Sequence, residues 1–366
     1  MSRNVLQISH DFKGPFVAIC RQFVDALPED QVTTVFLRGE SDSDIAESVG
    51  GKVHFLEQPG ENLRGFKFSQ ILRLYRLIQS ESYDLVIAHR YKGIYMAGIM
   101  SYFCNLPHLL GIAHEHNVFR RITRKLFVTF WRRQFKIAGV SSSVTANISQ
   151  YCPSLVTEKR LYTLPNALPL NYEHKILSRQ SARREMGIAE DAMLIGTIGR
   201  LVEKKSLHTL IEAFGRIEKT DNTYLAIMGD GPLLIPLQEQ AAALGIVDRV
   251  LFLGHVPQAG YRASAFDLFV LPSGVEEAFG IVLLEAMIAK VPVLSSDAPG
   301  PKQVVGTSGW LFSTGDSQGL AGRIADFMAL SETDRLQLGQ LGYERVQSEY
   351  THRHFSERLH RILADN

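Results

Sequence analysis

Two glutamates are the residues of this chain best suited to chemistry. Glu277 and Glu285 stand at the two ends of the stretch Glu277-Ala-Phe-Gly-Ile-Val-Leu-Leu-Glu285. All residues between them are apolar or glycine. Residues 280–289 have the pattern of a buried helix, where an ionised carboxylate needs a partner. Gly280 allows close approach of the backbone to a ligand, and amides at a helix start favour phosphate. The segment predicts a site for a nucleotide diphosphate joined to a sugar. A core helix whose Glu285 is bridged to a lysine or arginine is the alternative.

Loops after other predicted strands carry groups that suit a diphosphate. Arg200 and Lys205 follow a predicted strand at 193–198, where their charges could neutralise phosphate oxygens, although a solvated basic turn is the alternative. Gly229 and Gly231 form a glycine turn after the strand at 223–228, and Gly14 follows the first strand. Paired carboxylates also serve glycosidases, but these phosphate-type loops argue against that chemistry.

Histidines end two predicted strands of the first half. His89 ends the predicted strand at 85–89 and Arg90 follows it, while His114 ends the predicted strand at 108–114 and His116 lies two residues further on. A histidine there could orient a reacting hydroxyl near neutral pH, and a structural histidine is the alternative. The His-x-His spacing could indicate a metal, but no third ligand follows at a suitable spacing, so no metal site is predicted. The Asp-x-Asp at 42–44 lies in a polar, serine-rich segment and is interpreted as surface.

Residues 119–136 carry the strongest local charge bias, with seven basic residues, five aromatics and no acid. Basic residues beside aromatic ones suit an anionic membrane surface, and a polyanionic glycolipid would use the same surface. A domain helix with a solvated basic face is the alternative. The residues predicted for this contact are Arg120, Arg121, Arg124, Lys125, Trp131, Arg132 and Arg133.

Length and composition limit the remaining possibilities. With 366 residues, 45% of them hydrophobic, the chain exceeds one comfortable core and predicts two domains. The net charge of +1 gives no basic bias overall, so nucleic acid is not expected as a partner. Three widely spaced cysteines fit a reducing cytoplasm, and the start of the chain reads as a strand and not as a signal peptide. The longest apolar stretch, 94–113, is interrupted by polar residues and proline, so no membrane span is predicted.

Strands and helices alternate along the whole chain. Strands are predicted at 5–9, 32–37, 53–56, 85–89, 108–114, 137–140 and 160–164, and then at 193–198, 223–228, 250–253, 268–271, 291–295 and 310–312. Such alternation predicts an α/β fold of two doubly wound, Rossmann-like domains that face a cleft. The predicted domains are residues 1–170 on the acceptor side, residues 171–350 for the nucleotide sugar, and a helix at 351–366 that returns to the first domain.

The order of these motifs resembles the family 4 glycosyltransferases of the GT-B fold over nearly the whole chain. The motifs that carry the resemblance are Gly199-Arg200-Leu with Lys205, Gly229-Asp-Gly-Pro, Phe252-Leu-Gly, Asp267 with Leu271-Pro-Ser, the Glu277–Glu285 pair and Asp297 with Gly300. Short members of this family often build bacterial surface glycans, including the lipopolysaccharide core, so the resemblance implies such a role. It implies transfer of a hexose-type sugar with retention, without a metal or cofactor, from a UDP-sugar or alternatively a GDP-sugar to a glycan or glycolipid.

The resemblance also implies roles for single residues. Arg200 and Lys205 would hold the diphosphate, Glu285 the ribose and Glu277 the transferred sugar, while His114, or His116 in its place, would lie at the reacting centre. The residues expected to contact the donor are Gly14, Arg200, Lys205, Gly229, Gly231, Glu277, Phe279, Gly280, Ile281, Val282 and Glu285, with His89, Arg90, His114 and His116 on the acceptor side.

Some positions depart from the family pattern. Ser206 stands where a glycine usually follows the lysine, Gln303 replaces a common glutamate, and Ala167 replaces the glycine after Asn166. These departures affect the expected loop geometry and donor choice more than the reaction class. The expected location is the cytoplasm, on the inner face of a membrane. Another sugar-nucleotide enzyme such as an epimerase, and a catalytically silent nucleotide-sugar-binding protein, are the alternatives.

Overall fold

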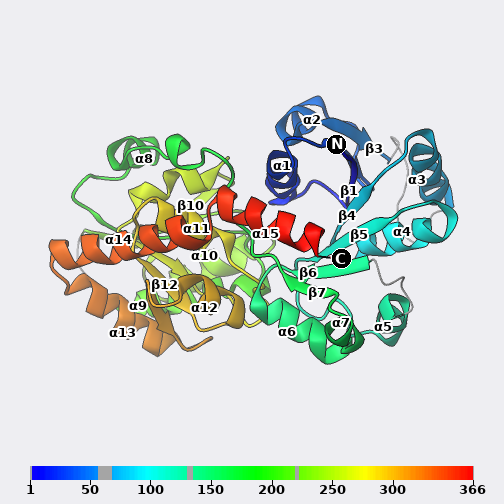
Figure 1. Ribbon diagram of the computed structural model, residues 1–366. Coiled ribbons are helices and arrows are strands. Elements are labelled where there is room, and N and C mark those ends of the chain that lie inside the picture. The colour runs from blue at the N-terminus through cyan, green and yellow to red at the C-terminus, as the bar shows by residue number, and fades with distance from the viewer. Residues whose placement is uncertain (1, 57–67, 130–134, 219–221, 366) are drawn as a thin grey trace. The chain divides into compact units, whose positions relative to one another are not determined.

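The computed structural model describes residues 2–56, 68–129, 135–218 and 222–365 (Figure 1). The chain divides into two compact units. Unit 1 contains Met1–Leu170 and His352–Asn366, and unit 2 contains Asn171–Thr351. Each unit is a parallel sheet with helices packed against it, so the predicted α/β class with two Rossmann-like domains is confirmed.

Unit 1 is built on seven parallel strands in the order β3-β2-β1-β4-β5-β6-β7. The strands are β1 Asn4–Ser9, β2 Gln31–Phe36, β3 Lys52–Phe55, β4 Leu85–His89, β5 His108–Ala113, β6 Phe135–Gly139 and β7 Leu161–Thr163. The helices are α1 Phe16–Ala26, α2 Ser43–Val49, α3 Phe68–Ser80, α4 Arg90–Phe103, α5 Ile122–Thr129, α6 Ser142–Tyr151, α7 Ser154–Thr157 and α15 His352–Ala364. Every residue of β4 is buried, as expected for a strand covered on both faces. The strand order reverses at β1 and β4, where α/β sheets commonly bind ligands.

The C-terminal helix α15 belongs to unit 1 through its packing on α1. The rings of Phe23 and Phe355 lie 4.9 Å apart, edge to face. The Ser356 hydroxyl donates to the Ala26 carbonyl at 3.2 Å. Nζ of Lys136, on β6, donates to the Ile362 carbonyl at 2.8 Å near the end of the helix. Residues that follow all of unit 2 in the sequence thus complete the core of unit 1.

Asp42, the first residue of the Asp-x-Asp motif, caps α2. Its Oδ1 accepts from the amides of Asp44 and Ile45, both at 3.0 Å. The motif therefore ends a loop and begins a helix, in agreement with its interpretation as surface.

We expect Asp42→Ala to lower the free energy of unfolding by about 1 kcal/mol, because two first-turn amides lose their acceptor. Denaturant unfolding measures the change, with Glu47→Ala, an exposed position within the same helix, as control. Equal stability of both variants would contradict the capping role.

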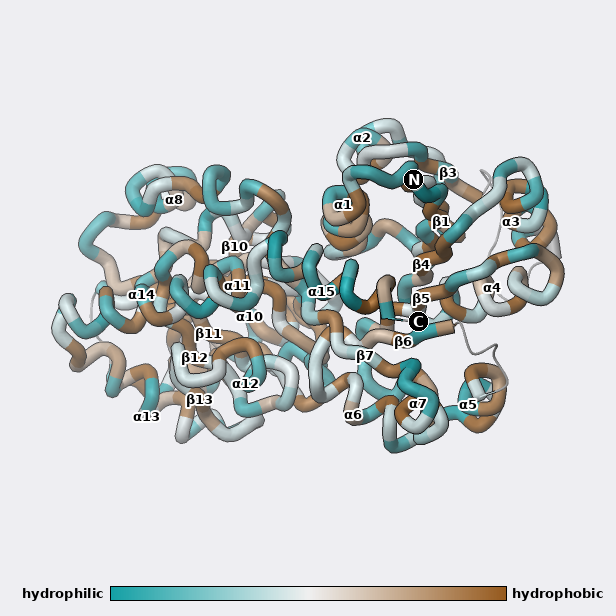
Figure 2. The backbone as a smooth tube through the Cα atoms, in the orientation of Figure 1, coloured by the Kyte–Doolittle hydropathy of each residue, from teal (hydrophilic) through white to brown (hydrophobic). Residues whose placement is uncertain are grey.

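Unit 2 is built on six parallel strands in the order β10-β9-β8-β11-β12-β13. The strands are β8 Met193–Ile198, β9 Thr223–Met228, β10 Val250–Gly254, β11 Leu268–Leu271, β12 Val293–Ser296 and β13 Trp310–Phe312. The helices are α8 Arg179–Glu185, α9 Leu207–Arg216, α10 Leu234–Ala243, α11 Ile281–Ile288, α12 Pro299–Val305, α13 Ser317–Met328 and α14 Glu332–Glu349, with short 3-10 turns η1 Glu173–Lys175, η2 Glu203–Lys205, η3 Val247–Arg249 and η4 Ala259–Ala265. Apolar residues gather along the strands of each sheet (Figure 2).

A buried cation network lies at the amino end of β11. The Arg183 side chain is only 1% exposed. It donates to the carbonyls of Ala265 and Ala192, both at 2.9 Å, and to Asp267 Oδ2 at 2.8 Å. Asp267 also accepts from the Leu194 amide at 2.7 Å, which ties β11 to β8. Asp267, one of the motif residues of the sequence, therefore holds the fold together at the end of the sheet opposite the glycine loops.

Candidate active site

The loops after β8, β9 and β10 pack backbone against backbone. The Leu201 amide donates to the Asp230 carbonyl at 3.0 Å, and the Gly229 amide donates to the Gly254 carbonyl at 2.8 Å. A Cβ at Gly229 would lie 1.8 Å from the Gly199 oxygen, and one at Gly231 would lie 2.5 Å from the Leu201 oxygen. Both glycines are therefore required by this close approach, whatever further contact they make with a ligand.

Lys205 and Glu277 form an ion pair at the carboxyl end of the sheet. Lys205 ends η2, and its Nζ lies 2.5 Å from Glu277 Oε2. The Ser273 hydroxyl, just after β11, donates to the same oxygen at 3.1 Å. Burial raises the pKa of Glu277, but Lys205 and the hydrogen bonds outweigh it, so that the pKa lies below its ordinary value. A carboxylate held ionised beside a cation can accept hydrogen bonds from sugar hydroxyls.

The residue after Lys205 is Ser206, where the family pattern has a glycine, and its backbone conformation is one that favours glycine. Ser206 adopts a φ of +48°, in the left-handed region that favours glycine. The Gly274 amide donates to the Lys204 carbonyl at 2.9 Å and joins this loop to the one after β11. The serine therefore keeps the loop conformation despite its side chain.

Arg200 differs from Lys205 in its environment. It follows β8, its side chain is exposed, and within the described ranges it forms no ion pair. Its charge is therefore available to an anion, whereas the charge of Lys205 is already compensated by Glu277.

The start of α11 presents backbone amides without a side-chain cap. Gly280 precedes the helix with a φ of +87°, and as a glycine it offers no side chain to cap the first turn. Ile281 and Val282 are half-buried there. The Phe279 side chain is buried against the Tyr350 ring at 5.9 Å, so only its backbone can face a ligand. The arrangement leaves amide donors open to a phosphate.

Gly300 fixes the loop that carries Glu277. A Cβ at Gly300, in the first turn of α12, would lie 2.5 Å from the Glu277 carbonyl oxygen and 2.4 Å from the Ala278 carbonyl carbon. The glycine after β12 thus lets α12 approach the backbone beside the carboxylate.

Glu285 lies on the second turn of α11 without a cationic partner. Burial raises the pKa of its carboxyl group from 4.5 to about 7, and a hydrogen bond from the Tyr172 hydroxyl opposes this rise. No Lys or Arg in the described part of the chain pairs with it. The alternative of a lysine or arginine bridge is therefore wrong, and no sequence pattern indicated the tyrosine that takes its place.

Unit 1 brings together the histidines of two strand ends. His89 Nδ1 lies 3.1 Å from His114 Nε2. Burial lowers the pKa of His89 to about 3, and burial with the nearby His89 and Arg90 lowers the pKa of His114 well below its ordinary value. Both rings are therefore neutral at pH 7, and His114 can exchange a hydrogen bond with a hydroxyl without carrying charge.

His116 and Arg90 make other contacts. His116 Nε2 lies 3.1 Å from the Ser143 hydroxyl at the start of α6. Arg90 lies 3.5 Å from Asp11 and 3.3 Å from Glu115. Gly14, with a φ of +64°, has open space where a Cβ would lie. Asp11, in the loop after β1, contacts Arg90 and so lies near these strand ends. The sequence had indicated this loop only as one that suits a phosphate.

The basic segment is described only in part. Arg120 and Arg121 are exposed, as are the apolar Ile122 and Leu126. Lys125 is half-buried, and Arg124 lies 3.9 Å over the Tyr91 ring, so part of this charge packs on the unit itself. The predicted contacts Trp131, Arg132 and Arg133 lie outside the described residues. Within the described ranges, no helix has the length and apolar character needed to cross a bilayer.

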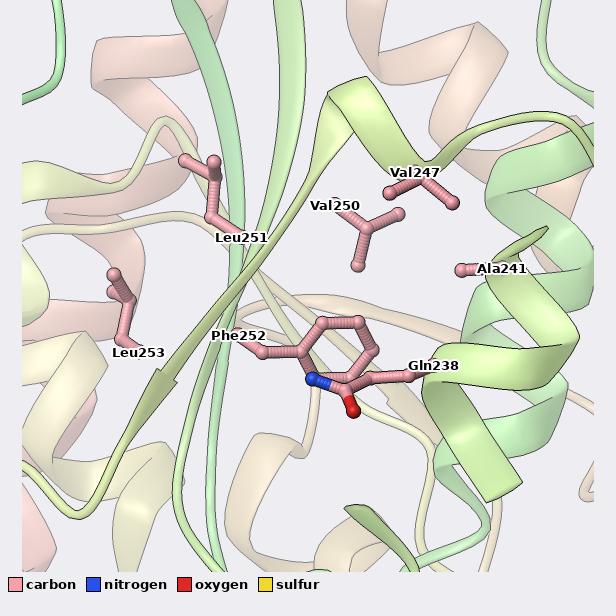
Figure 3. A pocket seen from close by; sticks show the side chains of 7 residues that line it. All are labelled: Gln238, Ala241, Val247, Val250, Leu251, Phe252 and Leu253. Atoms are coloured by element: carbon pink, nitrogen blue, oxygen red, sulfur yellow. The ribbon is translucent and has the colours of Figure 1, made fainter. Parts of the chain in front are cut away.

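A separate apolar pocket lies at the β10 edge of unit 2. Figure 3 shows Val250 and Phe252 pointing from β10 toward Ala241 and Gln238 of α10, while Leu251 and Leu253 point to the opposite face. Its lining holds no charged side chain, so it does not suit a diphosphate.

Known glycosyltransferases are similar to this chain in sequence. Residues 178–345 match the family described as Glycosyl transferases group 1. The lipopolysaccharide core biosynthesis glycosyltransferase LpsE of Rhizobium meliloti (strain 1021) is 31% identical over 184 residues, which cover 50% of this chain and 53% of that protein. LpsD of the same organism is 34% identical over 175 residues, 46% of this chain and 49% of that protein. The chain spans about half the length of these curated relatives.

Solved structures share the fold over the whole chain. Anabaena Alr3699/HepE in complex with UDP and glucose matches with a TM-score of 0.84 at 18% identity, covering 100% of both chains. WaaG, a glycosyltransferase involved in lipopolysaccharide biosynthesis, matches with a TM-score of 0.75 at 16% identity, covering 99% of this chain and 100% of that one. At these identities the likeness establishes the fold, which is that of GT-B glycosyltransferases. Residues 178–345, all within unit 2, are similar to the family described as Glycosyl transferases group 1.

Proposed function

We propose that the chain is a retaining glycosyltransferase that moves a hexose-type sugar from a nucleotide diphosphate sugar to a glycan or glycolipid. A UDP-sugar is the favoured donor, and lipopolysaccharide core or another cell-surface polysaccharide is the favoured product. The observation that carries the proposal is the convergence of Glu277, Lys205 and the uncapped start of α11 at the carboxyl end of one sheet. The names of LpsE and LpsD support the choice of product.

Each part of the donor would meet a group of suitable chemistry in unit 2. The diphosphate would lie at the amides of Ile281 and Val282, with the exposed Arg200 and with Lys205 as counter-ions. These groups can stabilise the negative charge that grows on the leaving diphosphate, so the reaction is proposed to need no metal. Glu285 would accept hydrogen bonds from the ribose, and Glu277 from the transferred sugar.

The acceptor side is proposed to lie in unit 1. His114, a neutral ring oriented by His89, would hydrogen-bond at the reacting centre, and Arg90 with His116 would line the acceptor. Arg120 and Arg121 are exposed next to the exposed apolar Ile122, and this combination supports peripheral contact with the inner face of a membrane. We therefore propose a cytoplasmic enzyme that works at the membrane surface.

The first test is thermal unfolding with a panel of nucleoside diphosphates and their sugar conjugates, with EDTA present. A ligand at one hundred times its dissociation constant adds about 2.7 kcal/mol of stability, which is readily seen. Stabilisation by the nucleotides of one base, and not by the others, would support the donor site and the absence of a metal requirement. The absence of any shift would overturn the proposal, and conversion of the donor without an acceptor would favour an epimerase.

We expect Glu285→Ala to weaken binding of that nucleoside diphosphate by about tenfold or more, because hydrogen bonds from the ribose to a carboxylate are lost. Titration calorimetry of the variant and of the wild type measures the change. Unchanged affinity would remove Glu285 from the ribose site.

A further inference from the structure

Tyr172 supplies the polar partner of the half-buried Glu285 carboxyl group. Its hydroxyl hydrogen-bonds to that carboxyl, and because an ionised carboxylate only accepts, the hydroxyl donates. The Tyr172 side chain is itself buried, and its ring lies 4.8 Å from the Tyr261 ring. A neutral donor thus occupies the place where a lysine or arginine would otherwise neutralise the charge.

The position of Tyr172 is fixed by contacts that do not involve Glu285. Glu173, the next residue, accepts from the Tyr343 hydroxyl and from the Gln347 amide of α14, each at 3.0 Å. The Leu177 amide donates to the Tyr261 carbonyl at 2.8 Å and joins the same segment to η4. The hydroxyl is therefore held at the carboxyl group by two neighbouring elements.

Gly260, on η4, leaves the space in which the two side chains meet. A Cβ at this position would lie 2.2 Å from the Tyr172 hydroxyl oxygen and 2.6 Å from Glu285 Oε2. Gly260 is not among the glycines with positive φ, so its backbone conformation is open to other residues. The atoms nearest to such a Cβ belong to Tyr172 and Glu285, so their contact requires the absence of a side chain there.

We infer that Tyr172 is a positioning residue for the nucleoside part of the donor: by donating to one oxygen of Glu285 it orients the carboxylate so that the other oxygen accepts from the ribose hydroxyls. The inference rests on the proposed function, because it takes the ribose as the ligand of Glu285. No family motif of the sequence contains Tyr172, which lies outside the residues expected to contact the donor.

The same hydrogen bond favours the ionised form of the carboxyl group against the effect of burial. Among the described residues, the titratable groups that interact with Glu285 are Tyr172 and Tyr261. On α14, Tyr343 faces Glu173 and the Lys290 ammonium group instead. Burial raises the pKa of Glu285 to about 7, and the Tyr172 hydroxyl acts against that rise. Without the hydroxyl the pKa moves further up, so more of the carboxyl is protonated at pH 7 and fewer lone pairs accept from the ribose.

The test compares Tyr172→Phe with Tyr261→Phe, which removes the hydroxyl of the neighbouring ring. Binding of UDP, or of whichever nucleoside diphosphate stabilises the wild type, is measured by calorimetry between pH 6 and pH 9. We expect Tyr172→Phe to weaken binding about tenfold at pH 7, with a smaller loss at pH 9, and Tyr261→Phe to match the wild type. Gly260→Ala, which places a methyl group against the pair, is expected to reproduce the loss. Glu285→Gln, which cannot ionise, is expected to bind weakly at every pH.

Each outcome has one meaning. Wild-type affinity and pH profile in Tyr172→Phe, with weak binding in Glu285→Gln, would overturn the inference and leave the proposed function standing. An equal loss at every pH together with a lower unfolding temperature would show a purely structural role and also overturn it. If the wild type bound no nucleoside diphosphate, the proposed function would fail and the inference with it.

Discussion

Glu277→Ala is expected to lower the turnover of sugar transfer by about a hundredfold or more while leaving the affinity for nucleoside diphosphate unchanged or higher. The carboxylate would act on the transferred sugar, which the free nucleotide lacks. Its removal also releases Lys205, which lies 2.5 Å from Glu277 Oε2 and would then have its full charge for the diphosphate. A loss of turnover without a loss of nucleotide affinity distinguishes Glu277 from Glu285, whose removal weakens nucleotide binding.

Release of nucleoside diphosphate from the donor, with isolated envelope glycolipid as acceptor, measures the turnover. Calorimetry with the nucleoside diphosphate measures the affinity. The control is Glu276→Ala, which removes the adjacent exposed carboxylate and should change neither quantity. Full turnover in Glu277→Ala would exclude it from the site, and a large loss of nucleotide affinity would show that Lys205 depends on the pair to hold its position.

Arg183→Met is expected to lower the free energy of unfolding of unit 2 by about 3–5 kcal/mol. The guanidinium is buried, and its removal leaves the carbonyls of Ala265 and Ala192 without their donor. Asp267 loses one of its cations in the same step. The methionine side chain retains the volume, so the loss reports the polar network and not a cavity.

Arg179→Met is the matched control, because Arg179 pairs with Asp267 at 2.6 Å but its side chain is 44% exposed. An exposed ion pair contributes about 0–1 kcal/mol, so this variant should be close to the wild type in denaturant unfolding. Equal losses in both variants would show that burial does not set the strength of this network.

The sequence predicted the sheets well because their strands are buried on both faces. Leu85–His89 and Leu268–Leu271 stand out as short apolar runs, and the structure has them at the predicted bounds. The strand predicted from residue 291 begins at Val293 instead, after Lys290 with a φ of +58° and a proline that has no amide to pair. Local backbone geometry of this kind is not visible in an apolar pattern.

Contacts between site residues could be predicted where those residues follow strands that are neighbours in the sheet. Lys205 and Glu277 follow β8 and β11, which are adjacent in the sheet, and they meet as an ion pair. The partner of Glu285 was not predictable, because Tyr172 precedes the first strand of unit 2 and has no motif around it. The role of Asp267 was also hidden, since only the structure shows Arg183 folding back onto it.

The docking of α15 on α1 has a consequence for the order of folding during synthesis. Unit 2 is continuous in sequence, whereas unit 1 receives its last helix only after residues 171–351 have left the ribosome. At cellular translation rates the wait is on the order of ten seconds. During that time the α1 surface around Phe23 has no Phe355 to cover it. We therefore expect unit 1 to complete its folding after unit 2, although N-terminal domains usually fold first during synthesis. We also expect chaperones to bind nascent chains that stall before residue 352.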